Sequence, residues 1–283
     1  MDAVITGAST GIGRSAVKVL VGHGWRGFAG VRTVADAESL RQEFGEAVEP
    51  LLFDVTDAAA VYRAADETRV KLGGHTLQGL VNNAGLAIGG PLAHQPINQI
   101  RRVFEVNTLG AVTVSQAFIP LLGADPSLSG GPGRIVNISS VAGRIAAPFL
   151  GDYAMSKHAL EAFSDSLRRE LMIYGIDVIV IGPGAIVTPI WDKAEATDDS
   201  VYAGTDFGPA LKRFKTAFIQ GGRHGLPVER LGVAIHLALT AAKPRARYVV
   251  SRDRLISWTL PMLLPKRVLD YVIARALRLT RRA

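Results

Sequence analysis

Short apolar runs alternate with longer helical patterns along most of this chain, and this alternation limits the fold to few architectures. Residues 3–5 and 176–181 are short apolar runs, whereas residues 12–22 place their apolar side chains on one helical face. Such alternation is typical of right-handed crossovers and a parallel sheet. Residues 178–181 (VIVI) are apolar on both faces, as expected for a strand that helices cover from both sides. We therefore predict an α/β fold with a doubly wound parallel sheet.

The same pattern places the other elements. Further strands are expected at residues 27–31, 50–53, 77–81, 134–138 and 247–251. Further helices are expected at residues 34–44, 58–72, 97–122, 153–174 and 227–242. No domain linker is evident, because the Gly-, Pro- and Ser-rich stretch at residues 124–133 suits a surface loop. Residues 1–254 are thus expected to form one domain, and residues 255–283 a helical extension.

A glycine-rich loop, TGASTGIG at residues 6–13, follows the first predicted strand and opens the first predicted helix. Glycines allow the backbone to approach a pyrophosphate, whose charge then lies at the helix N-terminus. The residues of this loop expected to bind the cofactor are Gly7, Ser9, Thr10, Gly11, Ile12 and Gly13. A simple glycine turn would have the same local sequence, but the position between strand and helix favours nucleotide binding.

The end of the second predicted strand distinguishes the two nicotinamide cofactors. An acidic residue there would bind the free ribose of NAD, whereas an arginine accommodates the 2′-phosphate of NADP. Arg32 follows the strand directly, and no Asp or Glu stands there. This favours NADP(H) over NAD(H), although an exposed loop cation would look the same. Asp54, after the third strand, would bond to adenine or cap the next helix, and Asp57 is the better candidate for the cap.

A tyrosine and a lysine share one face of the helix predicted at residues 153–174. Tyr153 is the only one of the six tyrosines with a lysine four positions later, at Lys157. Ser140 follows the buried strand predicted at residues 134–138. Each residue in isolation suits a structural role, but their joint spacing behind the glycine-rich loop favours a reactive centre.

Seven motifs together resemble the short-chain dehydrogenase/reductase family. They occur in the family's order and are TGASTGIG at 6–13, Asp54-Val55, NNAG at 82–85, Asn107, SS at 139–140, YAMSK at 153–157 and PGAIVT at 183–188. The resemblance covers about the first 190 residues, and the later part resembles the hydroxysteroid and retinol dehydrogenase branch. It implies a Rossmann fold and an oxidoreductase, with a lid over the substrate at about residues 186–225.

The resemblance also implies the role of each site residue. Tyr153 would be the general acid and base, and a cation about 5 Å away contributes roughly 3 kcal/mol toward its ionised form. Lys157 would supply that cation and bind the nicotinamide ribose, Ser140 would hold the substrate oxygen, and Asn107 would hold a water in a proton relay. The further cofactor contacts implied are Val55, Asn83, Ala84, Gly85, Pro183, Gly184, Ile186 through its backbone, and Thr188 through its side chain.

The charge of the chain is concentrated in its last residues. The formal net charge is +7, and residues 243–283 carry eleven Lys and Arg against two Asp, a balance of +9 that leaves −2 for residues 1–242. A nucleic-acid partner would need basic residues on the body as well, so none is expected. Absent cysteine excludes disulfides and thiolate metal sites, and the scattered histidines have no metal-binding spacing, so we expect no metal.

The basic tail contains an amphipathic helix that starts near residue 265. Its apolar half is formed by Val268, Leu269, Val272, Ile273, Ala276 and Leu277, and its polar half by Arg267, Asp270, Arg275, Arg278, Arg281 and Arg282. Three interpretations stay open: packing on its own domain or a second subunit, a lid over an apolar pocket, or peripheral contact with an anionic membrane through residues 255–283.

We therefore predict an NADP(H)-dependent oxidoreductase that interconverts a secondary alcohol and a ketone on a hydrophobic molecule such as a steroid, a retinoid or a lipid. Aromatic candidates for the pocket lining are Phe149, Trp191, Phe207, Phe214 and Trp258. The alternative is a catalytically idle nucleotide sensor or a membrane-surface scaffold on the same fold. The resemblance implies a homodimer or homotetramer assembled through helices 97–122 and 153–174. No signal peptide or membrane span is evident, which favours a cytoplasmic protein, peripheral to a membrane if the tail binds one.

Overall fold

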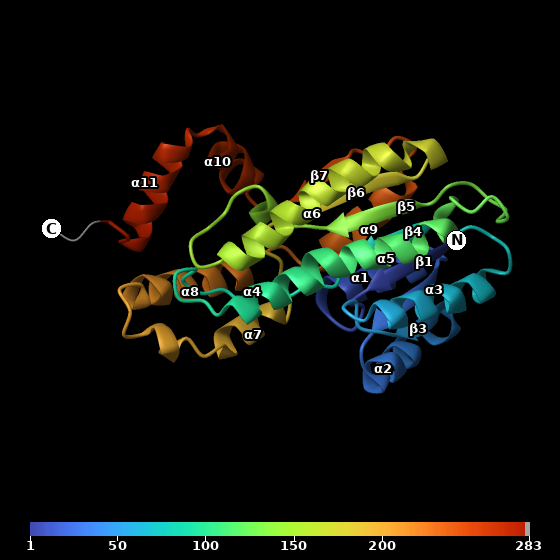
Figure 1. Ribbon diagram of the computed structural model, residues 1–283, viewed down its shortest axis with the longest axis horizontal. Coiled ribbons are helices and arrows are strands. Elements are labelled where there is room, and N and C mark those ends of the chain that lie inside the picture. The colour runs from blue at the N-terminus through green and yellow to red at the C-terminus, as the bar shows by residue number, and fades with distance from the viewer. Residues whose placement is uncertain (281–283) are drawn as a thin grey trace.

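The computed structural model describes residues 1–280, except for the side chain of Lys193, and contains the predicted parallel sheet (Figure 1). Its seven strands lie in the order β3-β2-β1-β4-β5-β6-β7, and each neighbouring pair is parallel. The strands are β1 (Asp2–Thr6), β2 (Arg26–Val31), β3 (Val48–Leu52), β4 (Gly79–Asn82), β5 (Arg134–Ile138), β6 (Asp177–Pro183) and β7 (Arg247–Val250). The chain reverses direction across the sheet between β3 and β4, which opens a crevice beside β1 and β4 at the carboxyl ends of the strands.

Helices cover both faces of the sheet and bury two apolar cores. On one face lie α1 (Gly11–Gly22), α2 (Val34–Phe44) and α9 (Glu229–Thr240), and on the other α3 (Ala58–Leu72), α5 (Gly110–Phe118) and α6 (Gly151–Glu170). Ile5 packs in the first core and its neighbour Val4 in the second, because successive strand residues point to opposite faces. This two-sided burial explains why the strands are apolar without alternation. The predicted α/β fold is confirmed.

The long helix predicted at residues 97–122 is confirmed, but it is not a regular α-helix throughout. It is divided into α4 (Ile97–Phe104), a π-helical turn (Glu105–Leu109), α5 and a 3₁₀ turn (Pro120–Leu122). The π turn contains Asn107, whose side-chain amide forms hydrogen bonds with the backbone N–H and carbonyl groups of Leu86. Such turns within helices are frequent at functional sites.

Residues 186–225 are more ordered than their weak periodicity indicates. They contain α7 (Ile190–Ala196) and the amphipathic α8 (Gly208–Arg223). Phe149 contacts Phe207 and Phe214, and Trp191 contacts Phe218, so these aromatic side chains pack mainly on one another. We call residues 186–225 the cap.

The C-terminal extension forms an arm beside the cap, and Figure 1 shows it in red next to α8. It consists of a π-helical turn (Leu255–Thr259), α10 (Leu260–Leu263) and α11 (Lys266–Leu277), which begins where the sequence predicts. Leu277 and Leu279 pack against the cap, and the Arg213 guanidinium on α8 donates to the Leu277 carbonyl at 2.8 Å. The predicted polar positions Arg281 and Arg282 lie outside the described residues. Within residues 1–280, the helices all lack the length and apolarity that a bilayer crossing requires.

Candidate active site

The glycine-rich loop forms a cradle at the start of α1. Gly7 and Gly11 have φ values of +62° and +55°, a region that favours glycine. A Cβ on Gly13 would lie 2.2 Å from the Gly7 carbonyl oxygen, so only glycine allows the helix to pack this closely. The N-cap residue of α1 is Thr10, and its side chain makes no capping hydrogen bond. The first backbone N–H groups of α1 are therefore available to an anion such as a pyrophosphate.

The turn after β4 braces this cradle from the side. The Asn83 amide nitrogen donates to the carbonyl oxygens of Thr6 and Gly7 at 2.9 and 3.0 Å. The Thr6 hydroxyl accepts from the backbone N–H groups of Asn83 and Ala84 at 2.9 and 3.0 Å. Thr6 is a structural support that our sequence analysis did not assign, although its place at the strand end directly before the first glycine is a usable signal.

Arg32 follows β2 at the carboxyl edge of the sheet, with 71% of its side chain exposed. Its guanidinium lies 4.0 Å from the Asp54 carboxylate. Burial acts to raise the pKa of Asp54, but hydrogen bonds from Thr56 outweigh it, and Arg32 adds to them, so the pKa is lowered. The helix cap is Asp57, as expected, because its carboxylate accepts from the Ala60 N–H at 3.0 Å. Arg32 is thus an exposed cation at this edge of the sheet, beside the Asp54 carboxylate.

Tyr153, Ser140 and Lys157 come together from β5 and α6. The strand ends at Ile138, and Ser140 opens the following turn, where its hydroxyl accepts from the Ala142 N–H at 3.1 Å. Tyr153 lies in the first turn of α6, and its phenol lies near the Ser140 side chain. Lys157 lies one helical turn later, with Nζ 5.7 Å from the centre of the tyrosine ring. The predicted trio is therefore contiguous in space.

The ionisation of this trio is governed mainly by burial. Burial raises the pKa of Tyr153, and the hydrogen bond with Ser140 opposes this rise. The Lys157 ammonium group donates to the Ile138 carbonyl at 2.9 Å, and the lowering of the Tyr153 pKa by this cation stays a prediction. Burial lowers the pKa of Lys157 to about 8, against the opposing effect of Glu161. At neutral pH, Tyr153 is a protonated acid beside a cation.

Asn107 lies close to Lys157, as the proton-relay interpretation requires. Its Nδ2 donates to the Leu86 carbonyl at 2.8 Å and to the Ser156 hydroxyl at 3.0 Å, and its Oδ1 accepts from the Leu86 N–H at 2.8 Å. A Cβ on Gly85 would lie 3.3 Å from this Oδ1 and 3.6 Å from the Lys157 Nζ. Gly85 thus leaves the space between the amide and the ammonium group open.

The segment after β6 runs over the glycine-rich loop. Gly184, directly after the last strand residue Pro183, donates its N–H to the Val250 carbonyl at 2.9 Å. The Ile186 carbonyl accepts from the Trp191 indole N–H at 2.6 Å, so this part of the predicted backbone contact already has a partner. The Thr188 methyl carbon lies 3.5 Å from where a Cβ on Gly11 would be. This segment and the cradle therefore lie side by side. Val55 is buried and packs against Gly110.

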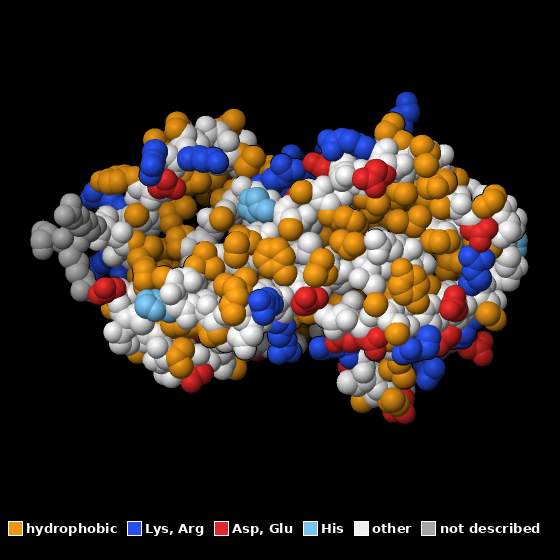
Figure 2. Space-filling view, viewed as in Figure 1, with side chains coloured by type: hydrophobic (Ala, Val, Ile, Leu, Met, Phe, Trp, Pro, Cys, Tyr) orange, Lys and Arg blue, Asp and Glu red, His pale blue; other side chains and the backbone are white. Residues whose placement is uncertain are grey.

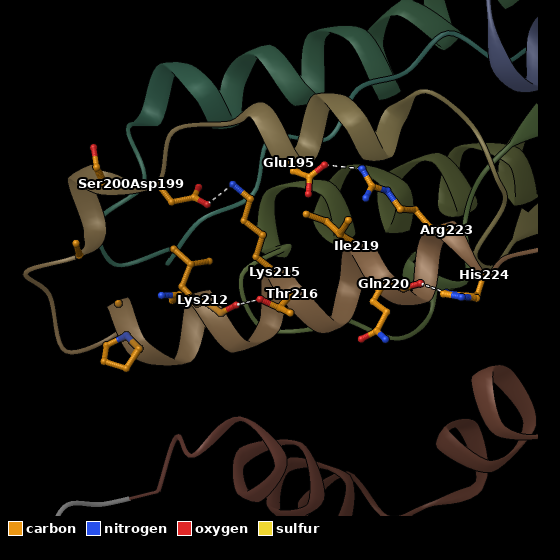
Figure 3. Close-up of a pocket in the computed structure, with 14 residues that line it drawn as sticks. Glu195, Asp199, Ser200, Lys212, Lys215, Thr216, Ile219, Gln220, Arg223 and His224 are labelled. Carbon is orange, nitrogen blue, oxygen red and sulfur yellow. Dashed lines mark hydrogen bonds and ion pairs between the residues drawn. The ribbon is translucent and has the colours of Figure 1, made fainter.

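A second hollow lies within the cap, between α7 and α8 (Figure 3). It has a volume of about 890 Å³, and Lys215 and Arg223 on its wall are paired with Asp199 and Glu195. None of its lining residues belongs to the predicted catalytic or cofactor set. Within residues 1–280, His, Asp and Glu side chains form no group of three or more that could hold a metal.

Glu161 is the residue that our sequence analysis missed nearest to the catalytic trio. It lies one helical turn after Lys157, is buried, and raises the pKa of that lysine. A buried acidic residue four positions after a reactive lysine is a usable signal, because both lie on the same helical face.

Comparisons with known proteins identify the family of this chain. The family model described as short chain dehydrogenase matches residues 2–199. The NADPH-dependent 3-dehydrocapnine reductase of Ornithobacterium rhinotracheale is 40% identical, over 98% of this chain and 97% of its own. Retinol dehydrogenase 5 of Mus musculus is 36% identical, over 95% of this chain and 86% of its own.

A solved structure shows the same fold. The short-chain dehydrogenase of Streptomyces avermitilis superposes with a TM-score of 0.76 at 24% identity, covering 98% of this chain and 94% of its own. The family match over most of the chain, together with these relatives, establishes that this protein is an oxidoreductase that belongs to the short-chain dehydrogenase/reductase family, in its retinol and hydroxysteroid dehydrogenase-like branch.

Proposed function

We propose that this protein is an NADP(H)-dependent oxidoreductase that interconverts a secondary alcohol and a ketone on a hydrophobic small molecule, and that it works chiefly as a ketone reductase. The observation that carries this proposal is the grouping of Ser140, Tyr153 and Lys157 at one edge of the sheet, with the Lys157 ammonium group 5.7 Å from the centre of the tyrosine ring. The raised pKa of Tyr153 keeps the phenol protonated, which suits donation of a proton to a carbonyl oxygen.

The chain's own groups would carry the proton side of the reaction. A bound nicotinamide supplies the hydride. Ser140 would hydrogen-bond to the substrate oxygen, Tyr153 would protonate it, and the Lys157 cation would stabilise the negative charge that develops on the phenol. Asn107, near the Lys157 ammonium group, would hold the water that returns a proton from solvent.

The residues around the crevice fit a dinucleotide. The close approach of Gly13 to the Gly7 carbonyl and the uncapped start of α1 provide a backbone cradle for a pyrophosphate. Arg32 is exposed where a 2′-phosphate would need a cation, with no acidic residue in its place. The NADPH-dependent relative supports the same choice, so we propose NADP(H) over NAD(H).

An apolar substrate is supported by the cap. Phe149, Phe207 and Phe214 form an aromatic cluster with Leu211 where the cap packs toward the α6 start. We propose that the cap, residues 186–225, closes over the substrate and that this cluster contacts it. A steroid-, retinoid- or lipid-like ketone fits such a surface. One relative is named a retinol dehydrogenase, which supports a substrate of this class.

The test is NADPH oxidation across a panel of hydrophobic ketones, with NADH as the matched cofactor control. We expect turnover with at least one lipophilic ketone and a lower KM for NADPH. NADPH binding without turnover on any ketone or alcohol would favour the alternative, an idle nucleotide sensor.

Exposed apolar residues support a contact between the arm and a membrane. Leu255, Ile256 and Leu263 are 69, 68 and 76% exposed, and Arg254 and Arg267 are exposed nearby. Figure 2 shows such side chains on the outside of the arm. Apolar residues flanked by cations suit an anionic membrane surface. We propose that the protein is cytoplasmic and binds an anionic membrane peripherally through the arm. The wild type should float with anionic vesicles, and the double variant Leu255→Ser/Ile256→Ser should not. Equal flotation of the wild type and the variant would contradict this proposal.

A second apolar surface supports self-association. Figure 2 shows hydrophobic side chains gathered over α5 and α6. Ile97 on α4, Leu109 in the π-helical turn and Met155 on α6 are exposed. We propose a homodimer or homotetramer assembled through this surface. Light scattering of the full chain tests it, and a monomer at micromolar concentration would overturn it.

A further inference from the structure

Arg247, the first residue of β7, reaches from the far edge of the sheet to the catalytic centre. Its Nη2 donates to the Ser140 carbonyl oxygen at 3.2 Å, and its Nη1 pairs with the Glu161 carboxylate. The Arg247 side chain is 18% exposed and that of Glu161 is 5% exposed. One guanidinium group therefore joins the turn that carries Ser140 to the helix that carries Lys157, largely out of water.

Two glycines leave the space that this pair occupies. A Cβ on Gly182 would lie 2.4 Å from the Arg247 Nη2, and a Cβ on Gly143 would lie 3.1 Å from the Glu161 Oε1. Gly182 belongs to β6 and Gly143 to the turn after Ser140, so two separate elements both accommodate the pair. The backbone around it is shaped to receive these side chains.

The arm covers the guanidinium group from outside. The Trp258 ring lies 4.5 Å from the Arg247 guanidinium carbon, which is a cation–π contact. Trp258 belongs to the π-helical turn Leu255–Thr259, and this turn is tied to the end of β7 because the hydroxyls of Ser257 and Ser251 are 2.7 Å apart. The start of the arm therefore packs directly on the support of the catalytic centre.

We propose that Arg247 is a positioning residue, which fixes Ser140 relative to Lys157 through Glu161, and that Trp258 of the arm holds it in place. This role deepens the proposed reductase function and rests on it. Arg247 acts through other residues: it fixes the backbone of Ser140, and it neutralises the carboxylate closest to Lys157.

The charges around Lys157 determine what removal of Arg247 does. Tyr153 and Glu161 face Lys157 from α6, and Arg247 faces Glu161 from β7. Arg144 also contacts Glu161, at 3.4 Å, and lies 3.9 Å from Asp165. Without Arg247, Glu161 is less neutralised and raises the pKa of Lys157 further. Without the Glu161 charge, burial of Lys157 is unopposed and its pKa falls.

The test compares Arg247→Met and Glu161→Gln with a matched control, Arg245→Met, which removes an exposed arginine two residues away. The readout is the pH dependence of kcat for ketone reduction, which should fall as Lys157 loses its proton. We expect this limb to move to higher pH in Arg247→Met, to lower pH in Glu161→Gln, and to stay in place in Arg245→Met. At its optimum, kcat of Arg247→Met should fall roughly tenfold to a hundredfold with the KM for NADPH little changed, because a small displacement of catalytic groups is costly.

The conservative variants separate positioning from folding. Arg247→Lys keeps the positive charge but loses the guanidinium group that contacts Ser140 and Glu161 at once. It should therefore lower kcat while kcat still falls over the same pH range as in the wild type. Trp258→Ala should lower kcat by about twofold to tenfold, and Trp258→Phe should restore it, because any aromatic ring offers a face to the cation. Should Arg247→Met fail to fold, the inference is tested by the other two variants. A lower kcat in Arg247→Lys and a fall of kcat at lower pH in Glu161→Gln support it, and wild-type behaviour of both overturns it.

A readout without turnover distinguishes this inference from the proposed function. The Lys157 titration can be followed by NMR of lysine labelled with ¹³C at Cε in the cofactor-free protein. Opposite shifts in Arg247→Met and Glu161→Gln support the inference even if no ketone is reduced. Two results would overturn the inference. One is an active enzyme in which Arg247→Met and Glu161→Gln both keep the kcat and the pH dependence of the wild type. The other is an equal Lys157 titration in all proteins.

Discussion

Lys157→Met is the substitution whose effect the structure sets most directly. The Lys157 ammonium group lies 5.7 Å from the centre of the Tyr153 ring; Lys157 is buried and Tyr153 is half-buried. At an effective dielectric constant of about 20, a unit charge about 5 to 6 Å from a phenolate contributes about 3 kcal/mol. Tyr153 develops this negative charge as it protonates the substrate oxygen, so the contribution lowers the barrier rather than the ground state.

The expected loss is therefore roughly a hundredfold in kcat, since each 1.4 kcal/mol or so is about tenfold in rate. Methionine has a similar length and no charge, and Glu161 keeps its pairs with Arg247 and Arg144. The Ile138 carbonyl loses its donor, which should lower the free energy of unfolding by about 1–3 kcal/mol. The decrease in kcat with rising pH, which the Lys157 pKa of about 8 predicts for the wild type, should disappear.

The assay is steady-state NADPH oxidation on a saturating ketone between pH 6 and 10, with the NADPH Kd from fluorescence titration and Tm as controls. Lys157→Arg keeps a cation and should recover part of the rate. If Lys157→Met binds NADPH and retains kcat within about threefold of the wild type at neutral pH, the electrostatic argument is refuted.

The remaining predictions concern the proton donor and the cofactor cradle. Tyr153→Phe should lower kcat by about a hundredfold to ten-thousandfold with NADPH binding unchanged, and near-normal turnover would exclude it as the acid. Gly13→Ala should abolish NADPH binding in fluorescence titration, because the added Cβ would lie 2.2 Å from the Gly7 carbonyl oxygen; the control is Gly22→Ala, whose Cβ would contact nothing within 4 Å. Arg32→Ser should raise the KM for NADPH about tenfold and leave that for NADH unchanged, and equal effects on both would sink the assignment of its 2′-phosphate role.

Local patterns were sufficient for the sheet and for the residues of the catalytic trio. The apolar runs gave each strand to within a few residues, because burial on both faces demands them. Spacing alone placed Tyr153 and Lys157 on one helical face, and chain order brought Ser140 to the same edge of the sheet. These inferences succeed because each depends on residues that are near in sequence or on strand ends that a parallel sheet aligns.

Interactions between distant segments account for the differences. The helix predicted at residues 97–122 contains a π-helical turn at Asn107, whose side chain bonds to Leu86, twenty-one residues earlier. The cap is helical because its aromatic and apolar side chains pack on Phe149, so its weak periodicity misled us. The Tyr153 pKa is raised because the packed fold buries the phenol, and the spacing of Tyr153 and Lys157 in the sequence carries no information about that burial.

The sequence by itself determined the parallel α/β architecture, the glycine cradle and which tyrosine, lysine and serine form the centre. Tertiary structure decided what supports that centre: Arg247 meets Glu161 across 86 residues, in a space that Gly182 and Gly143 leave open and Trp258 covers. The physical reason is the range of the forces. Helix and strand periodicities are written in neighbouring residues, whereas a buried ion pair depends on the distance between elements that only the packed fold sets.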